Sequence, residues 1–208
     1  ALRAARAVRV QIGFVWLGVR TPGRRSRKER TMAENIPVPQ LTTEAARAAR
    51  EVLLEQEREL RYPEGFGACE ALALGCAAIG LVPEYESGYS VTITRERDGV
   101  RVFQWVADDK DERNLLFAEG KRQAALAAGH ASPWAQLEAT IAGDLDAIWA
   151  RVPDEVPACG AFPIRVGDDW VATIAVSGLH DGLDHEVILR ALERTLGVRV
   201  SRWDAPVA

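Results

Sequence analysis

The sequence GAFPIRV at residues 160–166 decides the fold of this chain, together with VSGL at 176–179 and the pair Asp184-His185. Apolar residues alternate along these stretches, which predicts two strands, one ending at residue 166 and the other covering 170–176. The residues Gly-Asp-Asp at 167–169 predict a tight hairpin turn between them. A hairpin of this length must pair or protect its free edge, so we expect self-association.

A helix is expected after the second strand. Asp181 or Asp184 is suited to cap its start, and Gly197 is suited to end it. Apolar side chains recur at every fourth position between these points, as on one face of a helix: Ile188, Leu192 and Leu196.

Upstream of residue 160 the pattern predicts two helices, two strands and a long helical stretch, in that order. The expected ranges are 42–60, 68–79, 89–94, 100–106, 114–128 and 134–148. Antiparallel hairpins that are separated from the helices along the chain indicate an α+β fold, with a central antiparallel sheet and flanking helices.

Three surface properties follow from the same pattern. Four glutamates of the first helix are expected to form a solvated face: Glu51, Glu55, Glu57 and Glu59. The strand at 100–106 carries apolar residues on both faces, so it should be covered on both sides or lie at an interface. The acidic residues Asp108, Asp109, Asp111 and Glu112 lack the spacing of a calcium loop and indicate a solvated loop before a helix.

The charge of the chain is divided between a basic arm and an acidic body. Residues 1–31 hold eight arginines and Lys28 against the single acid Glu29, whereas the rest of the chain is strongly acidic. The arm has three interpretations: a signal peptide, an organelle transit peptide, or a non-native extension before Met32, the only methionine. We therefore expect a basic extension over residues 1–41, disordered or non-native before Met32, and a single domain over residues 42–204.

The acidic body excludes a general nucleic-acid surface, and no apolar run is long enough to span a membrane. The three cysteines, Cys69, Cys76 and Cys159, have neither disulfide-framework nor zinc-site spacing. They are expected to be buried free thiols in a reducing cytoplasm. The sequence also lacks a phosphate loop, a zinc-protease helix and a nucleophile elbow.

With these segments placed, the chain resembles the heme-degrading domain family, in a bacterial and fungal branch long catalogued as uncharacterised. The resemblance covers about Glu51 to Leu196 and rests on the stretches quoted first. A second block agrees with it: Asn114, Phe117, Lys121-Arg122 and Gly129-His130-Ala131-Ser132. The chain departs from the branch at Ala131, His180, Asp181 and Leu183.

The resemblance implies a profilin-like α+β fold that assembles into dimers and sometimes larger rings. Relatives include a secreted heme-binding partner of a sensor kinase, the terminal domain of some cobalamin adenosyltransferases and a protein of the glycolate operon. These functions are disparate, so the family alone leaves the reaction open.

The resemblance also points to a candidate ligand site. Heme needs an axial donor and partners for its propionates. His130 is the candidate axial and metal ligand, with the alternative that it only complements the dipole of a helix C-terminus. Lys121, Ser132 and Asn114 are further candidate contacts. His185 is another, with the alternative of a structural role at a helix start, and His180 is a weaker loop candidate.

Two functions remain open at this stage. The first is binding of heme or a related tetrapyrrole, with or without its oxidative degradation. The second is a non-catalytic module that binds or senses a small ligand and self-associates. A homodimer or higher homo-oligomer, located in the cytoplasm unless the basic arm exports it, is expected in either case.

Overall fold

The computed structural model describes residues 41–180 and 182–203. The basic arm and the lead-in up to residue 40 lie outside these residues. The chain order of the elements is α1 (Thr43–Glu59), β1 (Arg61–Tyr62), α2 (Ala68–Ile79), the short 3-10 helix η2 (Val82–Glu84), β2 (Ser90–Arg95), β3 (Val100–Val106), α3 (Glu112–Ala128), α4 (Pro133–Ala142), α5 (Leu145–Trp149), β4 (Ala161–Val166), β5 (Asp169–Ser177) and α6 (Leu183–Leu196).

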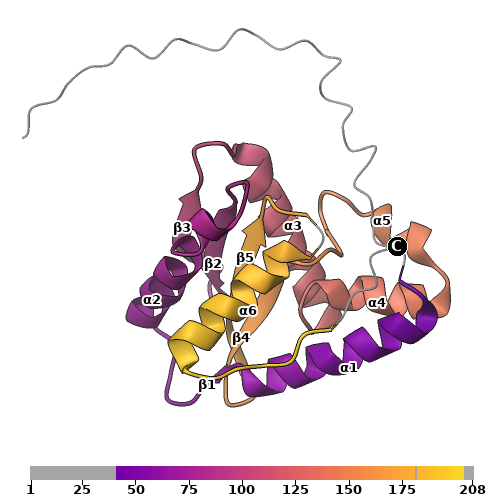
Figure 1. Cartoon of the computed structure of the whole chain (residues 1–208), viewed down its shortest axis with the longest axis horizontal. Coiled ribbons are helices and arrows are strands. Elements are labelled where there is room, and N and C mark those ends of the chain that lie inside the picture. The colour runs from indigo at the N-terminus through magenta and orange to yellow at the C-terminus, as the bar shows by residue number, and fades with distance from the viewer. Residues whose placement is uncertain (1–40, 181, 204–208) are drawn as a thin grey trace, which may run out of the picture. The chain divides into compact units, whose positions relative to one another are not determined.

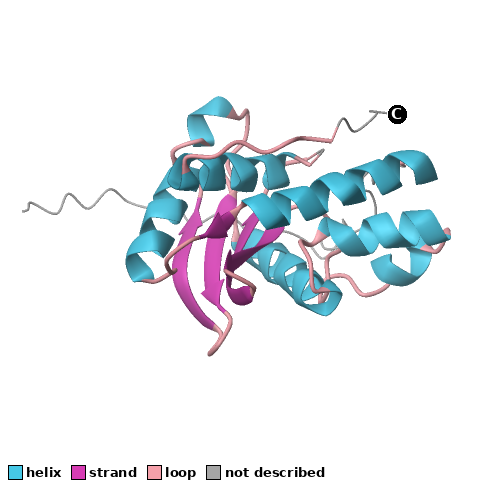
Figure 2. Ribbon diagram, turned by 90° about the horizontal axis from the view of Figure 1, so that it is seen from below, coloured by secondary structure: helices cyan, strands magenta, loops and turns pink. Residues whose placement is uncertain are grey.

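The strands form one five-stranded sheet in the order β1-β4-β5-β2-β3. All neighbours are antiparallel except β1 and β4, which are parallel. Helices α2 and α6 pack on one face and α3 on the other, while α1 packs against α4 (Figure 1; Figure 2). The predicted α+β fold with a mainly antiparallel sheet is confirmed.

The two faces of the sheet differ in the size of their side chains. The face under α2 and α6 buries large apolar residues, among them Phe162, Ile164 and Ile174. The opposite face presents small residues such as Ala161 and Ala175, which pack against the alanines of α3. Small side chains let a helix lie close to the strands, so polar groups of α3 can reach the strand backbone.

Local signals in the sequence start and end several helices. Thr42 caps α1, since its hydroxyl accepts a hydrogen bond from the Ala45 N–H at 3.2 Å. Asp111 caps α3 by accepting from the Arg113 N–H at 3.0 Å, and Gly129 ends that helix at a φ of 74°. Asp109 accepts a hydrogen bond from the Gly88 N–H. Two of the four clustered acids, Asp109 and Asp111, therefore accept hydrogen bonds from backbone N–H groups.

Two predicted boundaries are wrong. The helical stretch expected at 134–148 is divided into α4 and α5, because Gly143 adopts a φ of 76° and ends α4. The two-residue strand β1 was not predicted; Arg61 and Tyr62 become a strand only by pairing with Arg165 and Val166 of β4.

The last hairpin pairs its edges as expected, but it does so within the chain, so these edges no longer provide a reason for self-association. Its strands β4 and β5 lie inside the sheet, where β1 and β2 pair with their outer edges. Within the described residues the long unpaired edge belongs to β3, of which Val100 is exposed while Phe103 and Trp105 are half-buried. The predicted cover on both sides of this strand is therefore incomplete.

Asp184 does not cap α6. It is the second residue of that helix, Gly182 holds the cap position without a side-chain hydrogen bond, and Asp181 lies outside the described residues. Over residues 41–180 and 182–203, no helix combines the length and hydropathy that crossing a membrane requires.

Candidate functional site

Helix α1 carries two adjacent polar residues into the interior, Gln56 and Glu57. Gln56 is fully buried and Glu57 is only 6% exposed, so the prediction of a solvated glutamate face fails at this position. The reason is that the loop between α3 and α4 lies on Glu57. The sequence contained a signal for it, because positions 56 and 57 continue the buried stripe of Ala46, Ala49 and Leu53.

The Glu57 carboxylate holds that loop by two contacts. One oxygen accepts the Ala131 backbone N–H at 2.6 Å, and the other lies 2.9 Å from Nδ1 of His130. The His130 ring stacks on Trp134 with 3.9 Å between ring centroids and 23° between planes. Glu57 and Trp134 thereby hold the side chain of His130, of which 29% stays exposed.

These contacts decide which nitrogen of His130 is available. An ionised carboxylate only accepts hydrogen bonds, so in the neutral ring the proton lies on Nδ1 and Nε2 is left as an acceptor. Nε2 has no hydrogen-bond partner among the described residues. A histidine whose Nδ1–H is fixed by a carboxylate is the usual arrangement of metal-ligating histidines.

Two arginines stand beside this histidine. The Arg50 guanidinium lies 5.8 Å from the centre of the Trp134 ring and forms an ion pair with Glu138 at 2.9 Å. Arg165 donates to the carbonyl oxygen of Gly129, the residue before His130, at 3.2 Å. Both arginines are half-buried. A nitrogen donor, an aromatic ring and two cations suit a planar, carboxylate-bearing ligand such as heme.

Lys121 does not join this group. Its ammonium lies 2.5 Å from the Asp184 carboxylate and donates to the Val176 carbonyl at 3.1 Å, and both charged side chains are buried. Asp184 also accepts the Leu179 N–H at 3.0 Å. Burial raises the pKa of Asp184, against the opposing effects of Lys121 and the backbone donors. Lys121 thus joins α3 to α6.

The backbone leaves no space around this ion pair. Gly160 has a φ of 125°, and a Cβ there would lie 2.5 Å from the Val176 oxygen and 2.8 Å from the Lys121 nitrogen. The neighbouring Cys159 thiol has its pKa raised to about 11, mainly by burial. The GAFPI stretch therefore begins with glycine because the ion pair fills the space of a side chain.

The other predicted site residues have structural partners. Ser132 is buried, donates to the Ala158 carbonyl and accepts the Ala161 N–H at 2.9 Å, so it fixes the start of β4. Asn114 lies in the capping box of α3. His180 is exposed on a loop. The structure therefore brings His130 together with Glu57, Trp134, Arg50 and Arg165, of which only His130 had been predicted.

His185 contacts Gln56, the residue of α1 next to the Glu57 that holds His130. It is 3% exposed, and its Nε2 is 3.0 Å from the Gln56 side-chain oxygen. Burial, with a smaller effect of Arg202, lowers the pKa of His185 to about 3, so the ring is neutral. Its Nδ1 has no partner among the described residues. The structural role considered for His185 agrees with this placement.

The cysteine prediction holds only in part. All three thiols are free, but Cys69 and Cys76 are exposed on α2 instead of buried. The described residues contain no group of three or more histidine, cysteine, aspartate or glutamate side chains arranged to hold a metal ion.

The fold is shared with solved structures of low sequence identity. The crystal structure of the Ybr137w protein matches with a TM-score of 0.65 and 20% identity over 75% of this chain and 94% of that one. The structure of a double mutant of Streptomyces reticuli HbpS matches with a TM-score of 0.51 and 21% identity, over 67% of this chain and 92% of that one. A structure described as a PduOC:heme complex matches with a TM-score of 0.53 and 15% identity, over 69% of this chain and 100% of that one.

These similarities define a class of small α+β domains with helices on both faces of a five-stranded sheet. Residues 66–193 match the family described as "Haem degrading protein HbpS-like". The chain belongs to this family. Helix α1, with Gln56 and Glu57, lies before the matched residues, and the segment after α6 lies beyond them.

The buried ion pair gives a stability prediction. Lys121→Met alone leaves an unpaired carboxylate in the interior, and Asp184→Asn alone leaves an unpaired ammonium, so each should lower the free energy of unfolding by about 3–5 kcal/mol. The double variant should lose less than the sum of the two. Urea unfolding of the four proteins measures these values, and additive losses would show that the two charges do not interact.

Proposed function

We propose that this protein binds heme or a closely related tetrapyrrole, with Nε2 of His130 as the axial donor. The observation that carries the proposal is the Glu57–His130 contact, which engages Nδ1 while 29% of the His130 side chain stays exposed. Of the three histidines, His185 is enclosed, and His180 has no carboxylate contact among the described residues.

The surroundings of His130 support a tetrapyrrole over a bare metal ion. Trp134 adds an aromatic ring next to the donor, and Arg165 can bind a carboxylate, whereas Arg50 is already paired with Glu138 and Glu51. Membership of the HbpS-like family and the heme complex of the PduOC structure support the same ligand class. Bound heme would supply redox chemistry at its iron, and the protein would supply the donor and the cations.

The proposed function has two versions. In the first, the protein binds the ligand and degrades it oxidatively; in the second, it only binds the ligand. The family description favours degradation. Binding alone is favoured by the site itself, since its acidic group Glu57 is occupied by the Ala131 N–H and by His130. Three free cysteines support a reducing compartment, such as the cytoplasm, in both cases.

A heme titration followed in the Soret region tests the proposal. The wild-type chain should give a shifted Soret band, and His130→Ala should abolish it because the axial donor is removed. His180→Ala is the matched control and should bind like the wild type. An unchanged spectrum in His130→Ala would refute the assignment, and ascorbate-dependent bleaching of the wild-type band would distinguish degradation from binding.

Glu57→Gln provides a finer comparison in the same titration. The variant keeps the size of the side chain but loses the charge that holds Nδ1–H. Heme affinity should fall by about ten- to a hundredfold, the usual effect of losing such a supporting group. An affinity equal to that of the wild type would show that Glu57 has only a structural role.

A second candidate function, a self-associating module, has an observation of its own. The outer face of α2 exposes Cys69, Leu72 and Cys76 and carries no charge, and Leu72 is 58% exposed. The unpaired edge of β3 runs close to this helix (Figure 1). An uncharged helix face beside a free strand edge is typical of an oligomer interface.

Light scattering coupled to size-exclusion chromatography tests this candidate. We expect a dimer or larger assembly for the wild type and a smaller species for Leu72→Glu, since a charge would be buried in the interface. Leu116→Glu, at an equally exposed leucine of α3, is the matched control. A monomeric wild type would refute self-association through this face.

A further inference from the structure

The segment after α6 returns along the helix instead of leaving the domain. Gly197 ends α6 at a φ of 70°, and residues 198–203, which we name the C-terminal strap, run between α6 and α1 (Figure 1). Gln56 of α1 donates its side-chain N–H to the Ser201 carbonyl at 2.7 Å. The strap therefore touches both helices.

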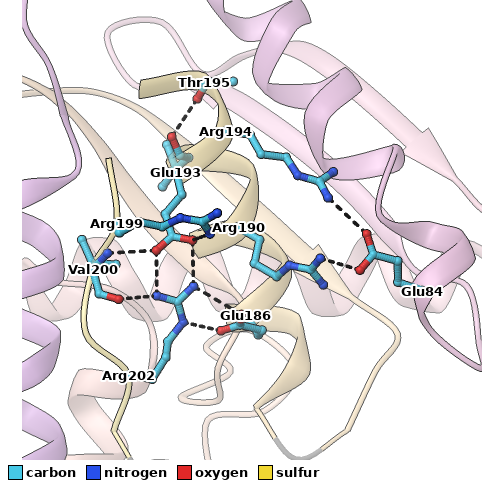
Figure 3. Close-up of polar contacts among 10 residues, drawn as sticks. Glu84, Glu186, Arg190, Glu193, Arg194, Thr195, Arg199, Val200 and Arg202 are labelled. Carbon is cyan, nitrogen blue, oxygen red and sulfur yellow. Dashed lines mark hydrogen bonds and ion pairs between the residues drawn. The ribbon is translucent and has the colours of Figure 1, made fainter. Parts of the chain in front are cut away.

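Ion pairs hold the strap to α6 (Figure 3). The Arg202 guanidinium donates to Glu186 at 2.6 Å and to Glu193 at 3.0 and 3.1 Å. The Val200 N–H donates to Glu193 at 2.9 Å, and Arg199 adds a contact at 3.2 Å. Every partner that the described residues offer to the buried Glu193 carboxylate thus comes from the strap.

The strap covers His185. The Trp203 ring lies 5.1 Å from the His185 ring, measured between centroids, with 32° between the planes, and Phe162 lies at 5.8 Å on the sheet. Nε2 of His185 is used by Gln56, while the buried Nδ1 has no partner among the described residues. An unpaired buried acceptor is unfavourable, so a group that donates a hydrogen bond to Nδ1 would stabilise this position.

The contacts of the strap differ in kind from those of the core. Arg202 and Glu186 are each about one third exposed, so water and salt reach the ion pair that fastens the strap. The leucines and isoleucine of α6 at 188, 189 and 192 are fully buried in the core, whereas Val200 and Trp203 of the strap are only partly buried against that core. Local opening of residues 198–203 can therefore occur while α6 stays packed.

We propose that the C-terminal strap is a releasable cover over a second ligand position, centred on Nδ1 of His185. Its opening uncovers three acceptors, Nδ1 of His185 and the carboxylates of Glu186 and Glu193, and one donor, the side-chain amide N–H of Gln56 that had bound Ser201. The ligand class that matches the acceptors is a planar aromatic cation with N–H donors, such as an aryl amidine. The amidinium of such a molecule resembles the guanidinium of Arg202, and its aromatic ring resembles that of Trp203. This position is separate from the His130 site and does not depend on heme binding.

Chemical modification of histidine by diethyl pyrocarbonate, read by mass spectrometry on the full chain, tests the cover. In the wild type His180 should react quickly and His185 slowly. Arg202→Gln should raise the rate at His185 by about tenfold or more, because the fastening of the strap is lost. Glu186→Gln, which leaves Glu193 paired, should give a smaller increase and replaces Arg202→Gln if that variant does not fold.

Arg199→Gln is the matched control, since Arg199 also contacts Glu193 but its side chain is 88% exposed. In this variant, diethyl pyrocarbonate should modify His185 at the same rate as in the wild type. In Arg202→Gln, benzamidine should slow the reaction at His185 and leave that at His180 unchanged. His185 that reacts no faster in Arg202→Gln and Glu186→Gln would overturn the cover, and a faster reaction without protection by benzamidine would overturn the ligand class.

Discussion

The buried carboxylate of Glu57 is the constraint on which the site depends. A carboxylate inside a protein is costly unless hydrogen bonds and charge compensate it, and here the Ala131 N–H and His130 provide that compensation. The loop after α3 is thereby fixed against α1. Ser132, the next residue, connects that loop to the start of β4 through the Ala161 N–H. One side chain thus determines both the orientation of His130 and the position of a central strand.

A second buried pair explains why the predicted lysine is absent from the site. Lys121 and Asp184 join α3 to α6 across the small-residue face of the sheet, where Gly160 makes room for them. The ammonium that the sequence offered for propionates is therefore used inside the domain. The cations nearest to the His130 loop are Arg165, which donates to the Gly129 carbonyl, and Arg50, which lies at the Trp134 ring and is paired with Glu138 and Glu51.

The sequence predicted the fold well and the site poorly, for a physical reason. Helix caps and stops such as Thr42, Asp111 and Gly129 act through neighbours in the chain, so local rules find them. The glycine at 143 is a local signal of the same kind, and it correctly marks the end of α4 inside the helical stretch expected at 134–148. Glu57, Asp184 and Arg165 act through partners 36 to 74 residues away, which no spacing rule identifies. His130 was predicted only through the resemblance to a family, and the lack of a partner for its Nε2 among the described residues is evident only in the three-dimensional structure.

Part of the support of both proposed ligand positions lies outside the residues that match the family: Glu57 and Gln56 in α1, and Arg202 and Trp203 in the C-terminal strap. The shared domain would then supply a scaffold, and the added segments would define what this protein binds. The central claim is that His130 ligates heme iron. Pulsed electron paramagnetic resonance of the ferric heme complex, made with ¹⁵N-histidine-labelled protein, tests it most directly. We predict a ¹⁵N hyperfine coupling that persists in His185→Ala and disappears in His130→Ala; a coupling that survives in His130→Ala would contradict the claim.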